Sequence, residues 1–259
     1  MSIRLIARLD IKSKHLIKGI QMEGWRIVGD PSARAEKYYL DGIDEILYID
    51  VVASLYQRNN LSEILEEAAR HAFIPITVGG GITDVQSAKA LMDVGADKIA
   101  VNTSATRRPE LLTELSVAFG SQAVVLNIEA KRLQSGGWTV MTDNGRNQTG
   151  LDAVEWAARA SKLGVGEILI SSIDQDGTKR GMDIDLIASI SQEVDLPIIA
   201  SGGCASSSHA LSAIDNGANA ISIGAALHTE RLCLKQLRSD LRASGCQVRP
   251  LPNTANQYV

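Results

Sequence analysis

The segment Pro75-Ile-Thr-Val-Gly-Gly-Gly-Ile82 is the strongest indication of the fold, because the chain contains a second copy of it. The copy is Pro197-Ile-Ile-Ala-Ser-Gly-Gly-Cys204, which begins 122 positions later. In both copies a proline introduces a short run of mostly β-branched residues, and paired glycines close it. Such a run predicts a buried strand that leads into a loop where the backbone comes close to another group.

Three further pairs of segments recur at nearly the same offset. Two pairs lie 122 positions apart and the third lies 119 apart; they are 42–47 with 164–169, 95–99 with 217–221, and Leu9-Asp10 with Ile128-Glu129. Glycines that merely end helices would not share one offset. The pattern therefore predicts two similar half-barrels, at about 1–120 and 121–246.

Strand-like and helix-like segments alternate along the whole chain. The expected strands are Arg4–Leu9, Glu45–Asp50, Ile76–Val78, Lys98–Val101, Ala123–Ile128, Glu167–Ser171, Ile198–Ala200 and Ala220–Ile223. The expected helices are Ser32–Leu40, Leu61–His71, Val85–Val94, Glu110–Phe119, Ala153–Leu163, Ile184–Glu193, Ser207–Asn216 and Glu230–Ala243. The alternation predicts one α/β domain over residues 1–246, a (β/α)8 TIM barrel with two-half internal duplication. A doubly wound open sheet is the alternative, and residues 247–259 are expected to form a mobile tail.

Composition narrows the classes of function. The 259 residues carry a net charge of −4 without a basic stripe, so nucleic acid and anionic membranes are poor candidates as partners. No stretch is apolar for long enough to cross a bilayer, and the three cysteines have no metal-type spacing, which together indicate a cytoplasmic protein with reduced thiols. The four histidines also lack metal spacing and no dinucleotide fingerprint is present, so we expect neither a metal nor a cofactor.

Glycines and small polar residues follow four of the expected strands. Glycine lets several backbone N–H groups point at one anion, and barrels often bind phosphate at the loops after strands seven and eight. Because the same device recurs in both halves, the expected ligand carries a phosphate at each end; the alternative is that the glycines only make tight turns. The expected binding residues are Gly80, Gly81, Asn102 and Thr103 in one half, and Ser201, Gly202, Gly203, Gly224 and Ala225 in the other.

Two carboxylates occupy duplicated positions, Asp10 at the end of strand one and Glu129 at the end of strand five. Facing acids can divide proton donation and acceptance between them, which a ring closure or an isomerisation requires. Helix or turn capping is the alternative for a lone Asp. We expect Asp174 and Asp176 to line the barrel mouth as well, with loop capping as their alternative. Lys18 could reach a phosphate or simply be solvated.

Two long connections interrupt the alternation, at Lys12–Asp30 and Ala130–Thr149. Long loops after barrel strands lie on the catalytic face and often act as lids. The alternating residues around Ser135-Gly136-Gly137 predict a small hairpin in the second connection.

Charged residues begin four strands, where a barrel floor is usually apolar. Two cations and two anions, Arg4, Glu45, Lys98 and Glu167, can form a closed ring around the axis. One interpretation is a plug that stabilises the floor. The other is a gate beneath a docked partner that feeds something through the barrel.

Taken together, these residues resemble the cyclase-subunit family of imidazole glycerol phosphate synthase over Arg4 to about Arg249. The segments that carry the resemblance are Leu9-Asp10, Lys18-Gly19, Asp30-Pro31, 77–82, 95–98, Asn102-Thr103, 119–123, 130–132, 172–178 and 200–203. The resemblance implies a two-half barrel that accepts ammonia from a glutaminase subunit docked on the N-terminal face. It also implies that ammonia attacks a phosphoribulosyl-formimino bisphosphate to give imidazole glycerol phosphate and aminoimidazole carboxamide ribotide.

The resemblance also implies roles for matching positions. Asp10 matches one of the family's two acid/base residues. One phosphate site is matched by Gly81, Asn102 and Thr103, and the other by Asp176, Gly177, Gly203 and Ala225. The four floor charges match an ammonia gate, and Asp97 and Gln122 match positions where the glutaminase docks.

The chain departs from the family pattern at three positions. Glu129 stands where the family has Asp, Arg8 stands where it has a small residue, and Ala225 replaces a small hydroxyl residue. Glutamate is one methylene longer, and a displacement of ~1 Å in a catalytic group can lower a rate by about 100-fold. An alternative function is therefore a non-cyclising ammonia-conduit subunit of an amidotransferase that amidates a sugar in surface polysaccharide synthesis. A further alternative is a sugar-phosphate isomerase of the sister barrel family.

Overall fold

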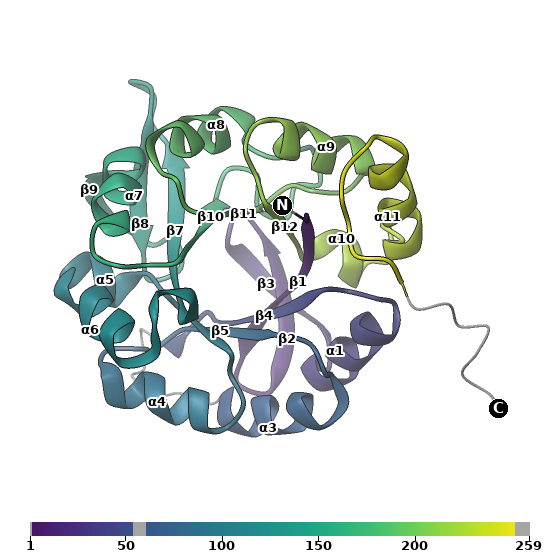
Figure 1. Cartoon of the computed structure of the whole chain (residues 1–259), viewed down its shortest axis with the longest axis horizontal. Coiled ribbons are helices and arrows are strands. Elements are labelled where there is room, and N and C mark those ends of the chain that lie inside the picture. Colours follow the sequence, from purple (N-terminus) through teal and green to yellow (C-terminus); the bar gives the residue numbers. More distant parts are fainter. Residues whose placement is uncertain (1, 54–60, 252–259) are drawn as a thin grey trace.

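The computed structural model describes residues 2–53 and 61–251, and in this part of the chain eight parallel strands close into a barrel. Figure 1 shows the helices arranged in a ring around the strands. The barrel strands are β1 (Arg4–Lys12), β4 (Glu45–Asp50), β5 (Ile76–Gly79), β6 (Lys98–Val101), β7 (Val124–Arg132), β10 (Glu167–Ser172), β11 (Ile198–Ser201) and β12 (Ala220–Ile223). The predicted TIM barrel is confirmed, and the open sheet is excluded because β7 pairs with β10 and β12 pairs with β1.

The order of strands around the barrel places the two halves opposite each other. The sequence β1-β4-β5-β6-β7-β10-β11-β12 closes on itself, so β7 lies four strands from β1 and β11 lies four strands from β5. Asp10 and Glu129 therefore project from opposite walls, as do the two glycine loops. This arrangement is what a two-half duplication requires, although common ancestry of the halves stays a prediction.

The outer ring consists of helices that begin and end at the expected signals. Aspartates at positions 30, 84 and 152 accept backbone N–H groups as N-terminal caps of α1, α4 and α7. The helix bounds are α1 (Pro31–Leu40), α3 (Leu61–His71), α4 (Val85–Asp93), α5 (Thr103–Arg107), α6 (Glu110–Phe119), α7 (Ala153–Ser161), α8 (Ile184–Glu193), α9 (Ser207–Asp215), α10 (Ala225–His228) and α11 (Leu234–Ala243), with a 3-10 turn η1 at Ser121–Ala123.

The last expected helix was placed wrongly at its start. Glu230 has φ +54°, a left-handed conformation that breaks a helix, so α11 begins only at Leu234. The short α10 lies before the expected segment and was not predicted. The short α5 directly after β6 was not predicted either. Both short helices follow a strand that ends in the candidate site, and they carry Thr103 and Ala225 at their first positions.

Both long connections are β-hairpins on the carboxyl-end face of the barrel. The first is β2 (His15–Ile20) with β3 (Glu23–Gly29), where the sequence indicated only a long loop. The second is β8 (Trp138–Thr142) with β9 (Asn147–Asp152); β8 pairs with an extension of β7 across residues 133–137, which confirms the predicted hairpin. The first hairpin positions Lys18.

Strand residues alternate between the barrel interior and the helices. On β1, Leu5, Ala7 and Leu9 belong to the large core beneath the helices, whereas Ile6 packs inside with apolar residues of other strands such as Leu169. The interior therefore has three levels along the axis. Charged residues lie at the floor, an apolar layer follows, and polar residues fill the upper levels near the carboxyl ends.

The start of the C-terminal segment packs beside the floor. The backbone N–H of Ile3 donates to the carbonyl of Gln247, and Ile3 and Val248 form an isolated parallel β-bridge. The Arg249 guanidinium pairs with the carboxylate of Asp44. The rest of the expected mobile tail, residues 252–259, lies outside the described residues. Among the helices that the structure does describe, none has the length and apolar character to cross a membrane.

Candidate active site at the carboxyl ends of the strands

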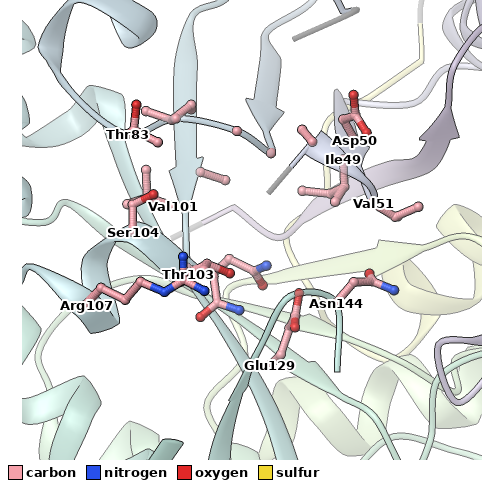
Figure 2. Close-up of a pocket in the computed structure, with 17 residues that line it drawn as sticks. Ile49, Asp50, Val51, Thr83, Val101, Thr103, Ser104, Arg107, Glu129 and Asn144 are labelled. Atoms are coloured by element: carbon pink, nitrogen blue, oxygen red, sulfur yellow. The ribbon is translucent and has the colours of Figure 1, made fainter. Parts of the chain in front are cut away.

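The larger candidate site is a cavity of about 120 Å³ on the side of β4, β5 and β6 (Figure 2). It brings together Gly80, Gly81, Asn102 and Thr103, as the sequence predicted, with Glu129 at its edge. Gly80 and Gly81 have φ +107° and +71°, and a side chain at Gly80 would collide with the backbone of Asp50. Glycine is therefore required for the loop to approach the cavity this closely.

A second cavity of about 20 Å³ lies across the mouth, beside β10, β11 and β12. Its lining includes the expected residues Lys18, Asp176, Gly177, Ser201, Gly202, Gly203, Gly224 and Ala225. Gly203 has φ +87° and lies against the backbone of Gly181, which leaves no room for a side chain. Lys179 and Arg8 add two cations to the lining. Glycine backbone and cations together are typical of a phosphate site.

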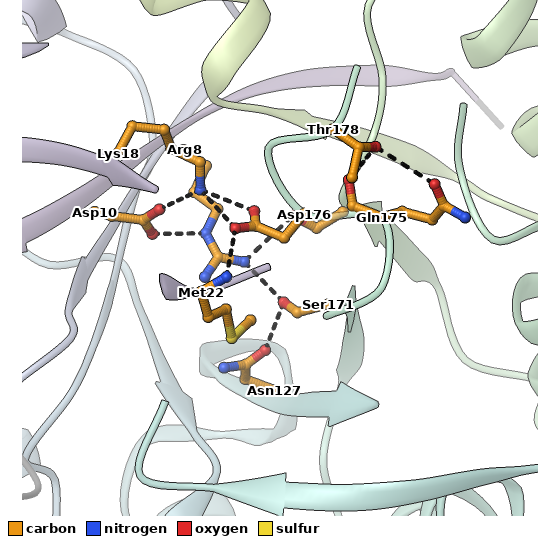
Figure 3. Close-up of polar contacts among 10 residues, drawn as sticks. Arg8, Asp10, Lys18, Met22, Asn127, Ser171, Gln175, Asp176 and Thr178 are labelled. Atoms are coloured by element: carbon orange, nitrogen blue, oxygen red, sulfur yellow. Dashed lines mark hydrogen bonds and ion pairs between the residues drawn. The ribbon is translucent and has the colours of Figure 1, made fainter. Parts of the chain in front are cut away.

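The carboxylate of Asp10 lies between two buried cations (Figure 3). It accepts hydrogen bonds from Arg8 Nε at 2.8 Å and from Lys18 Nζ at 2.7 Å, and Lys18 Nζ also contacts Asp176 Oδ1 at 2.8 Å. Burial alone would raise the pKa of Asp10, but Arg8 and Lys18 outweigh it and hold the pKa well below its usual range. Asp10 is consequently ionised at neutral pH.

Glu129 faces the site from the opposite wall in a different environment. It accepts one backbone N–H, from Gly145 at 2.8 Å, whereas Asp10 is paired with two cations. Burial raises the pKa of Glu129 to about 7, and the Gly145 N–H and the more distant Arg8 offset only part of that rise. The two carboxylates therefore have well-separated proton affinities.

The first hairpin is closed over the site. Gln21 N donates to the carbonyl of Asp176 at 2.8 Å, and Met22 N donates to its carboxylate at 3.3 Å. Lys18 belongs to this hairpin and its side chain is only 8% exposed, so the solvated alternative for this lysine is excluded. Burial opposes the charge of Lys18, but Asp10 and Asp176 outweigh that effect and raise its pKa above the ordinary value.

Asp174 does not join either cavity, although the sequence placed it at the mouth. Its carboxylate accepts the backbone N–H of Arg132 at 2.8 Å, at the base of the second hairpin. The capping alternative that the sequence left open therefore describes Asp174. Asp176, two residues later, turns inward.

The four floor charges form a closed ring, as their positions predicted. Arg4 pairs with Glu45 at 2.7 Å and with Glu167, and Lys98 contacts Glu45 at 3.3 Å and Glu167 at 3.0 Å. Cations and anions alternate, so every charge has two opposite neighbours. Asp97 immediately precedes β6, and its carboxylate accepts the N–H of Ile76. Gln122 lies in η1 just before β7, so both residues are on the floor side.

Sequence reasoning gave no role to several residues that the fold brings into the site. Arg107 and Asn144 line the larger cavity, and His228, buried beside Gly224, bonds the Tyr38 hydroxyl at 2.8 Å. Burial lowers the pKa of His228 to about 4, so its imidazole is neutral. Arg8 was recognised only as a departure from a family pattern. No sequence pattern distinguishes these residues, because the direction of each side chain depends on barrel closure.

The fold and the site define the class of this protein as a (β/α)8 barrel with two opposed glycine-lined cavities at the carboxyl ends of its strands and a buried acid on either wall of the mouth. Among the described residues no cluster of ligands suits a metal ion. The family described as "Histidine biosynthesis protein" matches residues 4–232.

Comparison with curated relatives identifies the family more specifically. The chain is 56% identical over 202 residues, 78% of this chain and 95% of the relative, to "Imidazole glycerol phosphate synthase subunit HisF" from Legionella pneumophila. It is 42% identical to the protein of the same name from Mycobacteroides abscessus, over 96% of this chain and 99% of the relative, and 39% identical to that from Thermobifida fusca over the same shares. The chain belongs to the HisF family of imidazole glycerol phosphate synthase subunits.

Proposed function

We propose that the chain is the ammonia-dependent cyclase of an imidazole glycerol phosphate synthase. Two opposed cavities with glycine-rich linings, separated by facing carboxylates, carry this proposal together with family membership. A substrate with a phosphate at each end would place its reacting centre between Asp10 and Glu129. The phosphate ends would be held by Gly80, Gly81, Asn102 and Thr103 on one side, and by Lys18, Asp176, Gly177, Ser201, Gly202, Gly203, Gly224 and Ala225 on the other.

The different environments of the two acids assign their roles. Asp10 is held ionised and accepts a proton as ammonia adds to the phosphoribulosyl-formimino substrate. Glu129, with a pKa raised to about 7, is protonated in a large fraction of molecules near neutral pH and donates a proton to the departing group. Ring closure then gives imidazole glycerol phosphate and aminoimidazole carboxamide ribotide.

The floor ring supports delivery of ammonia from below. We propose that a glutaminase subunit docks on the N-terminal face, near Asp97 and Gln122, and that Arg4, Glu45, Lys98 and Glu167 form the gate that ammonia passes. A ring of alternating charges opens when one member turns aside, which an apolar floor could not do. The proposed location is the cytoplasm, and the proposed organisation is one barrel with two half-barrels.

One observation favours a second candidate function, the non-cyclising ammonia conduit of a sugar amidotransferase. Arg8 and Lys18 both pair with Asp10, so the carboxylate of this proposed proton acceptor is already held by two cations. A protein whose barrel only conducts ammonia would tolerate this pairing, because it needs no proton acceptor at the mouth.

Turnover by the purified chain separates these candidates. The chain is mixed with ammonium chloride and the phosphoribulosyl-formimino bisphosphate, and both products are quantified. Equal amounts of the two products support the cyclase. Binding of a glutaminase without turnover supports the conduit. The ribulosyl substrate is itself an open-chain ketose, so its conversion without ammonia to the isomeric aldose form would instead indicate an isomerase.

A further inference from the structure

A line of hydrogen bonds crosses the whole interior of the barrel just below the two carboxylates (Figure 3). Arg8 Nη1 on β1 donates to Ser171 Oγ on β10 at 2.8 Å, and Ser171 Oγ donates to Asn127 Oδ1 on β7 at 3.0 Å. Because β7 lies directly opposite β1, the line joins opposite walls. We call Arg8, Ser171 and Asn127 the crossbar.

The position of the crossbar along the axis follows from the alternation of side chains. Arg8 and Asn127 lie two residues before Asp10 and Glu129 on the same strands, and two residues after Ile6 and Val125 of the apolar layer. The crossbar therefore separates the apolar interior from the carboxylates. Its members are 3%, 2% and 4% exposed for Arg8, Ser171 and Asn127, so it is an interior structure.

Arg8 has a second set of neighbours above the crossbar. Its guanidinium lines the smaller cavity with Lys18 and Lys179, and Ser201 accepts a further hydrogen bond from Nη1 at 3.3 Å. Three cations thus surround this cavity, whereas Asp10 and Asp176 supply two negative charges. The excess positive charge attracts an anion to this cavity, and a guanidinium binds phosphate more strongly than it binds a hydroxyl.

We infer that Arg8 is a ligand-sensing switch with two positions. In one it completes the crossbar and closes the upper end of the barrel interior. In the other it turns to an anion in the smaller cavity, which breaks the bond to Ser171 and opens the route from the apolar layer to the carboxylates. The ammonia-admitting role of the switch rests on the proposed function, whereas its two positions do not.

The switch makes a linkage prediction. If the bond to Ser171 stabilises only the closed position, removing that bond must favour the anion-bound position and strengthen anion binding. A net hydrogen bond of ordinary strength corresponds to about a 3- to 10-fold change in the dissociation constant. A residue that merely supports the fold would produce the opposite effect, because loss of packing weakens binding.

The test is a calorimetric titration of the full chain with inorganic phosphate, in wild type and three variants. Ser171→Ala is expected to bind phosphate about 3- to 10-fold more tightly, and Arg8→Met more weakly. Ser172→Ala is the matched control, because Ser172 lies on the same strand and bonds outward to Asp183; its affinity should equal that of wild type. Unchanged or weaker binding in Ser171→Ala would overturn the switch.

Side-chain nitrogen NMR provides a readout that a static role would not change. Phosphate is expected to shift the Arg8 Nε–H signal, identified by its absence in Arg8→Lys, and Ser171→Ala should shift the same signal part of the way without phosphate. An Arg8 Nε–H signal that does not shift when phosphate is added would contradict the proposal. Neither measurement needs turnover, so the switch and the proposed cyclase reaction can fail independently.

Discussion

At the scale of single residues, environment separates side chains that sequence alone treats alike. Asp174 and Asp176 lie two positions apart in one loop, yet Asp174 caps a backbone N–H and Asp176 binds Lys18 in the site. Asp10 and Glu129 occupy duplicated positions, yet their pKa values move in opposite directions. The sequence placed both loop aspartates at the mouth, and only Asp176 lies there, because side-chain direction in a loop depends on tertiary contacts.

Asp10→Asn removes the proposed proton acceptor without changing the size of the side chain. We expect ammonium-driven turnover to fall by at least about 100-fold, since general base catalysis contributes on this scale. The far-UV circular dichroism spectrum should match wild type, because Lys18 keeps its pairing with Asp176. Full activity in this variant would refute the assignment of Asp10.

The raised pKa of Glu129 predicts a pH-dependent stability. Its pKa rises from 4.5 in the unfolded chain to about 7 in the fold, so the folded state holds the proton more tightly. This contribution is fully present below about pH 4.5 and is lost as the pH rises through about 7, for a total of about 3 kcal/mol. Glu129→Gln stays neutral and should gain stability relative to wild type at pH 8 compared with pH 4.5.

Urea unfolding at the two pH values measures this difference, with the exposed Glu193→Gln as control. A Glu129→Gln variant whose stability relative to wild type is the same at both pH values would show that Glu129 ionises normally.

At the scale of elements, the barrel strands were predictable and the lid was not. Strands such as β4 and β11 are apolar on both faces, which marks them as covered by helices, and proline and glycine mark their ends. The first hairpin mixes apolar residues, polar residues and glycines, and its β-structure depends on docking to Asp176 and on pairing with an extended β1. Local sequence could not reveal that β1 extends to pair with β2, because tertiary contacts create this extension.

Gly177 tests how the hairpin closes. It has φ +70°, and a side chain there would collide with the carbonyl of Gly19 in the hairpin, so Gly177→Ala should lift the hairpin off the site. Gly24→Ala is the control, because Gly24 has φ +63° and no atom within 4 Å of the added carbon. We expect amide hydrogen exchange in residues 15–29 to accelerate roughly tenfold more in Gly177→Ala than in the control, equivalent to about 1.4 kcal/mol. Equal exchange in the two variants would contradict docking through Gly177.

At the scale of the whole molecule, charge is concentrated at both ends of an apolar interior. The floor ring lies at one end and the cation-bound carboxylates lie at the other, with Ile6, Val125 and Leu169 between them. The sequence predicted both ends, because the charges begin or end strands. It could not predict the crossbar, since the contact between Arg8 and Ser171 exists only in a closed barrel.

Lys98→Ala opens the floor ring and leaves the two glutamates to share Arg4. In the complex with a glutaminase we expect ammonium-driven turnover to stay within about twofold of wild type, because the mouth is unchanged, while product per glutamine consumed falls several-fold. Lys89→Ala, on the exposed face of α4, is the control. Unchanged coupling in Lys98→Ala would count against a gate at the floor.

The proposed function requires that two cavities on opposite walls hold one ligand by its two phosphate ends. A crystal of the chain soaked in inorganic phosphate would show this. We expect two bound ions, one against Gly81 and Thr103 and the other against Gly203 and Ala225. A single occupied cavity at saturating phosphate would contradict it.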